Sequence, residues 1–586
     1  KHLTDIRDRL YRKSRKKGSA KTESRFLLYK QIVKKRIRKQ HAAYIHNLFT
    51  DESKSKEDLN KQFWTYVKHR RSQAMTQIGP LKKGVSLVTA AEEMAEMLNN
   101  QFVSVFSKRT PKLDYEVPTL ASKMKNITIS KAGVLKQLKS LKTNKACGPD
   151  GIHPRVLKEL APTLAETFTN LFQTSLDKGT VPKDWRTALV CPAFKKGEKY
   201  LPENYRPISL TSIASKMMEH IITSHLMNFA ESNKLLFKNQ HGFRKHRSCE
   251  KQLIEFVSDI ANQLDQGLQT DACVLDFSKA FDKVNHQKLL SKLATLGVSF
   301  QVISWIDNFL TDRSQRVVVD GVMSNEAHVT SGVPQGSVLG PALFLFYIND
   351  LPDALRSTVR LFADDTILYN SADNNKLLQD DLARLELWES KWDMEFHPKK
   401  CQHISFSRKR HPAHNAYSLH NIEIPKAEHV KYLGVTLDQK LTWKNHAESI
   451  INKSNSALGF IRRNVITTST QVKSTAYKQL VRPVLEYASG AWDSLTKTQE
   501  KNIEAVQRRA ARLIFNISRT DHTTSTTKLL QDLELDELAT RRQHARLKIF
   551  KQYHFSEEET ISNYLSKACV ASKRKHPHQY MIPHSS

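Results

Sequence analysis

Two apolar segments that run into acidic residues constrain the fold of this chain more than any other feature. The first segment, 272–275, leads directly into Asp276, and the second, 359–369, is apolar on both sides of Asp364 and Asp365. A short apolar run is typical of a buried strand, and an Asp pair between two such runs is typical of a tight β-hairpin. We therefore predict a sheet that carries carboxylates where its strands end.

Carboxylates gathered at one edge of a sheet need a positive partner. They repel one another, and partial burial would raise their pKa values unless a cation offset the charge. Carboxylate oxygens are the ligands that Mg²⁺ prefers. The pair Asp364 and Asp365 alone is also compatible with an ordinary surface turn, but together with Asp276 it predicts a magnesium site.

The charge of the chain is unevenly distributed. The formal net charge is +33, and residues 1–50 hold 16 Lys and Arg against 3 Asp and Glu, whereas residues 271–370 hold 8 against 11. A strong positive charge favours an acidic partner, most often nucleic acid. We expect a basic amphipathic helix from Phe26 to Phe49 that contacts nucleic acid or acts as a hinge, a solvated charged face being the alternative.

Composition excludes several other classes of protein. In 586 residues, 39% hydrophobic side chains exclude wholesale disorder, and six Cys without a CxxC pair argue against a disulfide scaffold or a zinc finger. The longest apolar stretch, from Ala342 to Ile348, is too short to cross a bilayer. The sequence opens at Lys1 with no secretory signal, so we expect an excised part of a longer protein.

A loop rich in glycine lies between the two acidic segments, at 331–341. It contains three Gly, two Pro and a single amide side chain, Gln335. Glycine lets a backbone approach a ligand closely, and an amide can bond to a base or a sugar. A plain structural turn is the alternative interpretation.

Seven blocks of the sequence resemble the reverse transcriptase motifs of non-LTR (LINE-type) retrotransposons, and they occur in the same order. The helical end, notably 480–488 and 506–510, looks like the jockey-like branch of that family. The seven blocks are Lys145-Ala-Cys-Gly-Pro-Asp-Gly151, Asn204-Tyr-Arg-Pro-Ile-Ser-Leu210, Gln240-His-Gly-Phe-Arg244, Leu275-Asp-Phe-Ser-Lys-Ala-Phe-Asp282, Gly332-Val-Pro-Gln-Gly-Ser-Val-Leu-Gly340, Phe362-Ala-Asp-Asp365 and Tyr432-Leu-Gly434.

The resemblance implies roles for particular residues. Asp276, Asp364 and Asp365 would be catalytic and would hold two Mg²⁺ ions, with Mn²⁺ as a possible substitute. Lys400 is similar to a lysine that protonates pyrophosphate, although Lys399 could serve instead and a solvated loop lysine is the alternative.

The resemblance also implies a nucleotide site. Phe281 matches the bulky position that excludes a 2′-hydroxyl, with an ordinary core Phe as the alternative. Gln335 and Gly336 match the loop near the incoming nucleotide. Lys195 and Arg206 look like a triphosphate-binding pair, with solvated surface charges as the alternative.

A short hairpin near residue 433 completes the predicted site. Tyr432, Leu433 and Gly434 resemble the primer grip of the family, and a hairpin that only packs on a sheet is the alternative.

The expected fold is α+β, a right-hand polymerase with a helical basic N-terminal extension and a helical C-terminal thumb. The expected divisions are an N-terminal extension (1–128), fingers with part of the palm (129–270), palm and primer-grip hairpin (271–440), helical thumb (441–555) and polar tail (556–586). Composition and hydrophobic periodicity further predict a linker at 110–119, one long helix from Arg155 to Lys178 and strand structure from Val430 to Leu437.

The function expected from the resemblance is RNA-directed DNA polymerase activity. The enzyme would use dNTPs to extend a DNA 3′ end on an RNA template by two-metal nucleotidyl transfer, in target-primed retrotransposition. The alternative is an inactive, domesticated protein of the same fold that only binds RNA. No membrane partner is expected, and an endonuclease domain is expected upstream in the full-length element. The expected location is intracellular, in the nucleus and in cytoplasmic ribonucleoprotein.

Overall fold

The structure is a computed structural model that describes residues 2–50, 55–70, 78–107, 123–467, 469–518, 520–521 and 523–554. The chain divides into two compact units. One, here called the terminal unit, combines residues 1–75 with 442–561, and the other, the central unit, contains residues 76–441. The division splits the range 1–128, which the sequence analysis treats as one extension. The predicted linker at 110–119 and the tail at 556–586 lie outside the described residues.

A four-stranded antiparallel sheet in the central unit carries the two acidic segments. Its strand order is β11-β5-β10-β9, so the hairpin β9–β10 lies beside β5. The strands are β5 (Thr270–Leu275), β9 (Thr358–Phe362), β10 (Asp365–Ser371) and β11 (Gln402–Phe406). The predicted strands at both acidic segments are therefore confirmed.

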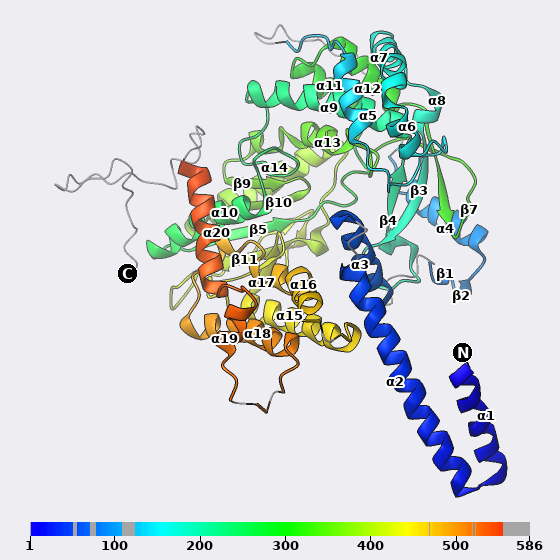
Figure 1. Ribbon diagram of the computed structural model, residues 1–586. Coiled ribbons are helices and arrows are strands. Elements are labelled where there is room, and N and C mark those ends of the chain that lie inside the picture. The colour runs from blue at the N-terminus through cyan, green and yellow to red at the C-terminus, as the bar shows by residue number, and fades with distance from the viewer. Residues whose placement is uncertain are drawn as a thin grey trace. The chain divides into compact units, whose positions relative to one another are not determined.

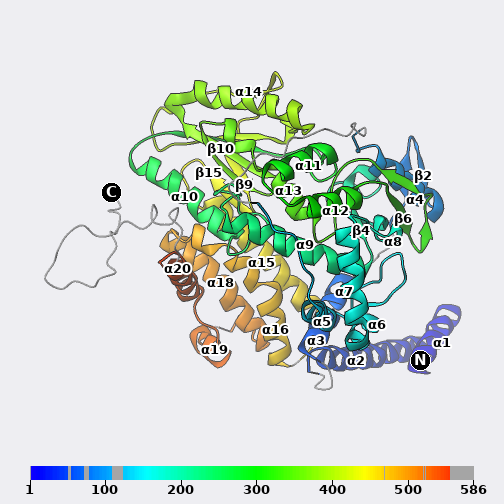
Figure 2. The same ribbon diagram turned by 90° about the horizontal axis from the view of Figure 1, so that it is seen from above.

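Helices cover both faces of this sheet, as Figure 2 shows for α10 and α14. Alternate residues of a strand face opposite sides. Tyr369 of β10 packs its ring on Phe256 of α10, 5.2 Å between centroids, whereas the neighbouring Leu368 belongs to the buried cluster that includes Leu382 of α14. Burial on both faces explains why these strands read as continuous apolar runs.

A second sheet in the central unit has the order β4-β3-β6-β7, with β8 also paired to β6. Strand β3 pairs antiparallel with β4 and parallel with β6. The strands are β3 (Thr187–Phe194), β4 (Tyr205–Leu210), β6 (Arg313–Val319), β7 (Val322–Met323) and β8 (Ala327–Val329). Three two-stranded hairpins complete the strands: β1 (Leu81–Lys83) with β2 (Ser86–Val88), β12 (Ser418–Leu419) with β13 (Ile422–Glu423), and β14 (His429–Tyr432) with β15 (Val435–Asp438).

The apolar helix α13 (Gly340–Ile348) is buried along its whole length. A helix that is apolar all round belongs in a core, and α13 supplies Leu343, Phe344 and Phe346 to the main cluster of the central unit. Among the helices that the structure describes, none combines the length and the apolarity needed to cross a membrane.

The remaining helices of the central unit surround the two sheets (Figure 1). The α-helices are α4 (Ala91–Val103), α5 (Lys131–Ser140), α6 (Pro154–Glu159), α7 (Ala161–Asp177), α8 (Lys183–Arg186), α9 (Ile213–Ser232), α10 (Cys249–Asp265), α11 (His286–Thr295), α12 (Phe300–Leu310) and α14 (Asn375–Trp392). The 3₁₀ helices are η1 (Pro202–Asn204), η2 (Leu351–Ala354), η3 (Ala372–Asn374) and η4 (Pro398–Lys400).

The described part of the terminal unit is helical and joins the two ends of the chain. The hydroxyl of Tyr66 in α3 donates to the carbonyl of Asn464 in α15 at 2.6 Å, and Gln479 of α16 donates to Asn60 at 2.7 Å. The helices are α1 (His2–Lys17), α2 (Ala20–Thr50), α3 (Lys56–Arg70), α15 (Lys444–Asn464), α16 (Thr470–Leu480), α17 (Arg482–Glu486), η5 (Ser489–Ala491), α18 (Lys497–Ile514), α19 (Thr526–Asp532) and α20 (Leu538–His554).

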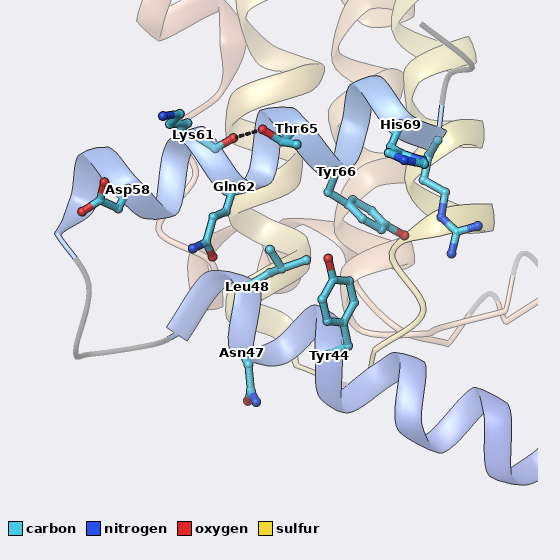
Figure 3. Close-up of a pocket in the computed structure, with 10 residues that line it drawn as sticks. Tyr44, Asn47, Leu48, Asp58, Lys61, Gln62, Thr65, Tyr66 and His69 are labelled. Atoms are coloured by element: carbon cyan, nitrogen blue, oxygen red, sulfur yellow. Dashed lines mark hydrogen bonds between the residues drawn. The ribbon is translucent and has the colours of Figure 1, made fainter. Parts of the chain in front are cut away.

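The basic segment at the start of the chain forms two long helices of the terminal unit. Helices α1 and α2 lie side by side (Figure 1), and Tyr11 packs on Phe26 with 5.3 Å between ring centroids. The predicted helix from Phe26 to Phe49 is thus confirmed as part of α2. A cavity of about 1150 Å³ lies between α2 and α3, where the rings of Tyr44 and Tyr66 face each other edge to face (Figure 3).

One predicted helix differs in the structure. The single helix expected from Arg155 to Lys178 is broken into α6 and α7 at Leu160, because Pro162 has no amide hydrogen and its ring clashes with the preceding turn of a continuing helix. The strand structure expected from Val430 to Leu437 and the hairpin expected near residue 433 are both confirmed as β14–β15. The mixed α and β character of the fold is confirmed.

Candidate active site

The pairing of β5 with β10 brings two of the predicted carboxylates together. Thr366 lies opposite Leu275 in the antiparallel register. Asp365 precedes Thr366 and Asp276 follows Leu275, so the same register sets Asp276 and Asp365 side by side at the end of the sheet. Directly opposed residues share a face of a sheet, which places both carboxylates on the face that also carries Tyr369.

The third carboxylate, Asp364, lies in the turn of the β9–β10 hairpin. Phe362 pairs with Asp365, so Ala363 and Asp364 alone form the turn. Ala363 has a φ of 53°, in the left-handed region that a residue with a Cβ adopts only when its surroundings hold it there. The tight turn keeps Asp364 next to the other two carboxylates.

The block at 240–244 supplies the support for this turn. The side-chain oxygen of Gln240, which is buried, accepts from the amides of Gly242 at 2.8 Å and Ala363 at 2.9 Å. The amide of His241 donates to the carbonyl of Leu361 at 2.9 Å. A Cβ on Gly242 would lie 2.4 Å from the amide nitrogen of Ala363, so this approach requires glycine.

Burial and neighbouring charge both make two of these carboxylates, Asp364 and Asp365, harder to ionise. Burial, followed by the charge of Asp276, raises the pKa of Asp364. Burial and the charges of Asp364 and Asp276 raise the pKa of Asp365 to about 6, although solvent still reaches this side chain. The charges of Lys195 and Arg206 oppose both shifts. Coulombic interactions weaken with distance, so these two basic and three acidic groups form one cluster.

The two basic residues of this cluster lie on the β3–β4 hairpin. Arg206 pairs with Ala193 in the sheet, and the amide of Lys195 donates to the carbonyl of Asn204 at 2.8 Å. Both side chains are exposed. Partial burial, followed by the charge of Arg206, lowers the pKa of Lys195, and Asp276 opposes this shift.

Lys400 approaches the cluster from η4, where its side chain is exposed. Its charge contributes to the lowered pKa of Lys195. The amide of His397, which begins this segment, donates to the carbonyl of Asp276 at 2.8 Å, and the amide of Lys400 donates to the carbonyl of His397 at 2.8 Å. The main chain therefore ties the lysine segment to the strand that ends in Asp276.

Phe281 lies between two other aromatic rings. Its ring stacks on Phe344 of α13, with 4.4 Å between centroids and 17° between planes. On another side, Phe243 meets it edge to face at 6.4 Å and 85°. Phe281 is half-buried, so part of its ring is accessible in the site region.

The glycine-rich loop is fixed to both Asp282 and β4. The Nε2 of Gln335 donates to Asp282 at 2.9 Å, and burial raises the pKa of Asp282 while this hydrogen bond opposes the shift. The carbonyl of Gln335 accepts from the amide of Ser209 at 2.7 Å. Gly336 has a φ of 123°, and a Cβ there would lie 2.5 Å from the carbonyl oxygen of Ser209, so this position also requires glycine.

The predicted primer-grip residues form the turn of β14–β15. Tyr432 pairs with Val435, and Leu433 and Gly434 make the turn with φ values of 43° and 86°. Tyr432 is buried, and its hydroxyl accepts from the Nε2 of Gln252 at 3.0 Å. Tyr432 therefore anchors the hairpin, whereas Gly434 is exposed at its tip. The role of all three residues stays a prediction.

Sequence reasoning assigned no role to four residues that support the site: Gln240, Gly242, Phe243 and Asp282. Each lies inside a block that carries the family resemblance, and that membership is the only signal for them in the sequence. The partners of Gln240 and Asp282 are 123 and 53 positions away, respectively. No local pattern identifies such contacts.

The donor set suits a hard divalent cation by chemical type. Among the residues that the structure describes, no three His, Cys, Asp or Glu side chains are set closely enough to hold a metal ion as they stand. Burial and neighbouring carboxylates raise the pKa values of Asp364 and Asp365, and the charges of Lys195 and Arg206 oppose these shifts. A divalent cation bound by carboxylate oxygens would offset that charge.

A known protein family matches the region of the chain that contains the candidate active site. Residues 194–437 match the family described as "Reverse transcriptase (RNA-dependent DNA polymerase)". This range contains every residue of the candidate active site.

Curated relatives cover a larger part of the chain. A probable RNA-directed DNA polymerase from transposon BS of Drosophila melanogaster is 28% identical over 78% of this chain and 53% of its own length. The corresponding protein of the X-element from the same organism is 30% identical over 63% of this chain and 42% of its own length. The RNA-directed DNA polymerase from mobile element jockey, also from Drosophila melanogaster, is 27% identical over 75% and 50%. The chain thus spans about half the length of these relatives.

Carboxylates at neighbouring strand ends, a basic hairpin and a glycine-rich loop all lie within the range that matches the reverse transcriptase family. The relatives above are RNA-directed DNA polymerases from transposons and a mobile element. This part of the chain is therefore similar to reverse transcriptases of the jockey-like, non-LTR type.

The close packing at Gly242 gives a first prediction. Gly242→Ala should destabilise the protein by about 1–3 kcal/mol, because the new methyl group overlaps the main chain of the Ala363 turn. Denaturant unfolding measures the change. Gly79→Ala is the matched control, since nothing lies within 4 Å of a Cβ at that position. Equal stability of the two variants would contradict the packing at the turn.

The charge cluster gives a second prediction. In a chelating buffer at pH 7.5, Asp365→Asn should raise the melting temperature above that of the unchanged protein. The pKa of Asp365 in the fold, about 6, exceeds its ordinary value of 3.8, so its ionisation costs stability as the pH rises between these values. The gain should vanish near pH 4, where Asp365 is largely protonated in the fold. Asp380→Asn, on an exposed position of α14, is the control, and an equal gain there would refute the explanation.

Proposed function

We propose that this chain is an RNA-directed DNA polymerase that extends a DNA 3′ end on an RNA template. The observation that carries the proposal is the convergence of Asp276, Asp364 and Asp365 beside Lys195 and Arg206 inside the reverse transcriptase domain. Acidic side chains suit a metal cation and basic side chains suit a polyphosphate, so a site with both suits a reaction that uses both.

The proposed architecture is a right hand. The second sheet with its helices, including the β3–β4 hairpin, corresponds to the fingers, and the four-stranded sheet with α10 and α14 corresponds to the palm. Helices α15–α20 correspond to the thumb, and the basic helices α1–α3 are a nucleic-acid-binding extension. The support for this assignment is the match of the domain and the position of the carboxylates in the four-stranded sheet.

In the proposed mechanism, Asp276, Asp364 and Asp365 hold two Mg²⁺ ions, with Mn²⁺ as a possible substitute. When bound, such ions supply the charge that activates a 3′-hydroxyl and stabilises departing pyrophosphate. Lys195 and Arg206 bind the triphosphate, because both are exposed at the carboxylate cluster and a guanidinium suits phosphate oxygens. Lys400, whose charge reaches Lys195, donates a proton to the leaving pyrophosphate.

Selection of the nucleotide falls to Phe281 and Gln335. The ring of Phe281 is held by Phe344 and leaves no room for a 2′-hydroxyl, so deoxynucleotides are chosen by exclusion. Gln335, fixed to Asp282 by its amide nitrogen, presents the loop with Gly336 to the incoming nucleotide. Tyr432 anchors the hairpin that presents Leu433 and Gly434 to the primer.

We further propose that the polymerase acts in the retrotransposition of a mobile element. The relatives of this chain are polymerases of transposons and mobile elements, which supports synthesis by target-primed retrotransposition from RNA onto target DNA. From the family resemblance alone, an endonuclease domain upstream in the full-length element is also part of the proposal. We also propose a location in cytoplasmic ribonucleoprotein and in the nucleus, since the proposed reaction uses an RNA template and target DNA.

Primer extension tests the proposal against an RNA-binding protein without activity. With a DNA primer on an RNA template, Mg²⁺ and dNTPs, we expect synthesis that Asp276→Ala and Asp364→Ala each reduce by at least about a thousandfold. RNA binding, measured by fluorescence anisotropy, should stay unchanged, since these carboxylates do not contribute positive charge to it. Asp380→Ala is the control for loss of a carboxylate elsewhere in the domain. Full synthesis by either active-site variant, or none by the unchanged protein, would refute the proposal.

A further inference from the structure

A groove of about 910 Å³ beside the glycine-rich loop carries basic side chains and no acidic ones. Helix α5, the loop at 141–146, strand β4 and helix α9 form its walls in the central unit. Within the described residues that line it, there is no Asp or Glu. The basic lining residues are Lys136, Lys142, Lys145, Lys216, His220 and His225.

One end of this groove reaches the candidate active site. Gly336 lines the groove, and the preceding Gln335 bonds through its carbonyl to Ser209, another lining residue. Ile208 also lines the groove, two residues beyond Arg206 on β4. Residues two apart on a strand share a face, so the surface that carries Arg206 continues into the groove.

The lysines of the groove lack an acidic partner within it. Lys216 is half-buried, and its pKa is lowered by burial, with a further contribution from Lys145, while Glu219 opposes the shift. Glu219 lies buried behind the wall, where its carboxylate accepts from the amides of Val338 and Leu339. These two amides share one carboxylate oxygen, and the other accepts from the hydroxyl of Ser215. Both oxygens of Glu219 are therefore engaged, and the open side of the groove presents like charges that favour a polyanion.

We propose that this groove holds the unpaired RNA template strand just ahead of the active site. The lysines contact successive phosphates, and the apolar wall that includes Leu141, Ile213 and Met217 faces the bases. This inference rests on the proposed polymerase function. It adds a binding surface that lies outside the carboxylate cluster and whose occupant is identified by charge and by continuity with Gly336.

The length of the template overhang tests the groove. Primer extension is measured on two templates that share one duplex and extend beyond the primer end by one nucleotide or by eight. The triple variant Lys136→Ala, Lys142→Ala, Lys145→Ala should lose roughly tenfold in apparent affinity for the long template and keep its affinity for the short one. Its affinity for the long template should also depend less steeply on salt.

The matched control removes three charges nearby without touching the groove. Lys123→Ala, Lys125→Ala, Lys139→Ala changes three exposed lysines that do not line it, and circular dichroism checks that both triple variants fold. Equal behaviour of the two variants on the long template, or an equal loss by the groove variant on both templates, would overturn the inference. The second result would indicate a nucleotide or a general charge effect. Absence of synthesis by the unchanged protein would refute the polymerase function instead.

A second inference rests on the backbone and exposure of Phe243. Its φ is 54°, a left-handed conformation that costs energy for a residue with a Cβ, and the residue is 56% exposed. The preceding Gly242 is held against the Ala363 turn, so the main chain has little freedom to relax. The strained position brings the ring of Phe243 edge to face with Phe281, on a different side from Phe344.

The geometry assigns Phe243 as a positioning residue for sugar selection. Phe344 supports Phe281 by stacking, and Phe243 limits its rotation from the exposed side. A smaller residue at 243 would let the ring of Phe281 move aside and admit a 2′-hydroxyl. This inference also rests on the proposed function, in which Phe281 excludes ribonucleotides.

Incorporation kinetics with matched dNTP and rNTP test this role. Phe243→Leu should lower the ratio of the two kcat/KM values by about tenfold, mainly by lowering the KM for the ribonucleotide, and Phe243→Tyr should retain the ratio. An equal slowing of both substrates by Phe243→Leu would indicate a merely structural role and overturn the inference. Phe281→Ala is assayed in parallel. If its ratio also equals that of the unchanged protein, the sugar gate of the proposed function fails.

Discussion

Repulsion among Asp276, Asp364 and Asp365 is the constraint on which the active-site region depends. The sheet register sets Asp276 beside Asp365, and the strained two-residue turn holds Asp364 next to them. Burial and this repulsion raise the pKa of Asp365, and the charges of Lys195 and Arg206 oppose the shift. The segments around the β9–β10 turn therefore hold like charges close together.

The supports for that arrangement come from distant parts of the chain. Gln240 bonds the amide of Ala363, and the close packing at Gly242 leaves no space for the turn to relax. The same segment continues into Phe243, so one strained stretch borders both the carboxylate turn and the ring of Phe281. The segment 240–243 thereby connects the carboxylate cluster to the ring that we propose selects the sugar.

Acidic and basic side chains gather on different parts of the structure. A net charge of +33 coexists with an acidic window, because the lysine groove beside Gly336 and the basic helices α1 and α2 offer positive surfaces while the four-stranded sheet offers negative ones. The two basic surfaces belong to different compact units. Helix α3 is joined to α15 by the hydrogen bond from Tyr66 to Asn464, and the N-terminal and C-terminal helices belong to one compact unit.

The sequence alone determined the strands, the acidic cluster and the class of protein, because apolar runs, turn residues and ordered motifs are local signals. It identified Asp276, Asp364 and Asp365 as a set, and strand pairing confirmed that the register sets Asp276 beside Asp365 and the turn sets Asp364 next to them. Only the tertiary structure decided which residues support them. The bonds from Gln240 to Ala363 and from Tyr66 to Asn464 join positions 123 and 398 residues apart. Such contacts depend on how elements pack in space, and no periodicity or spacing in the sequence encodes them.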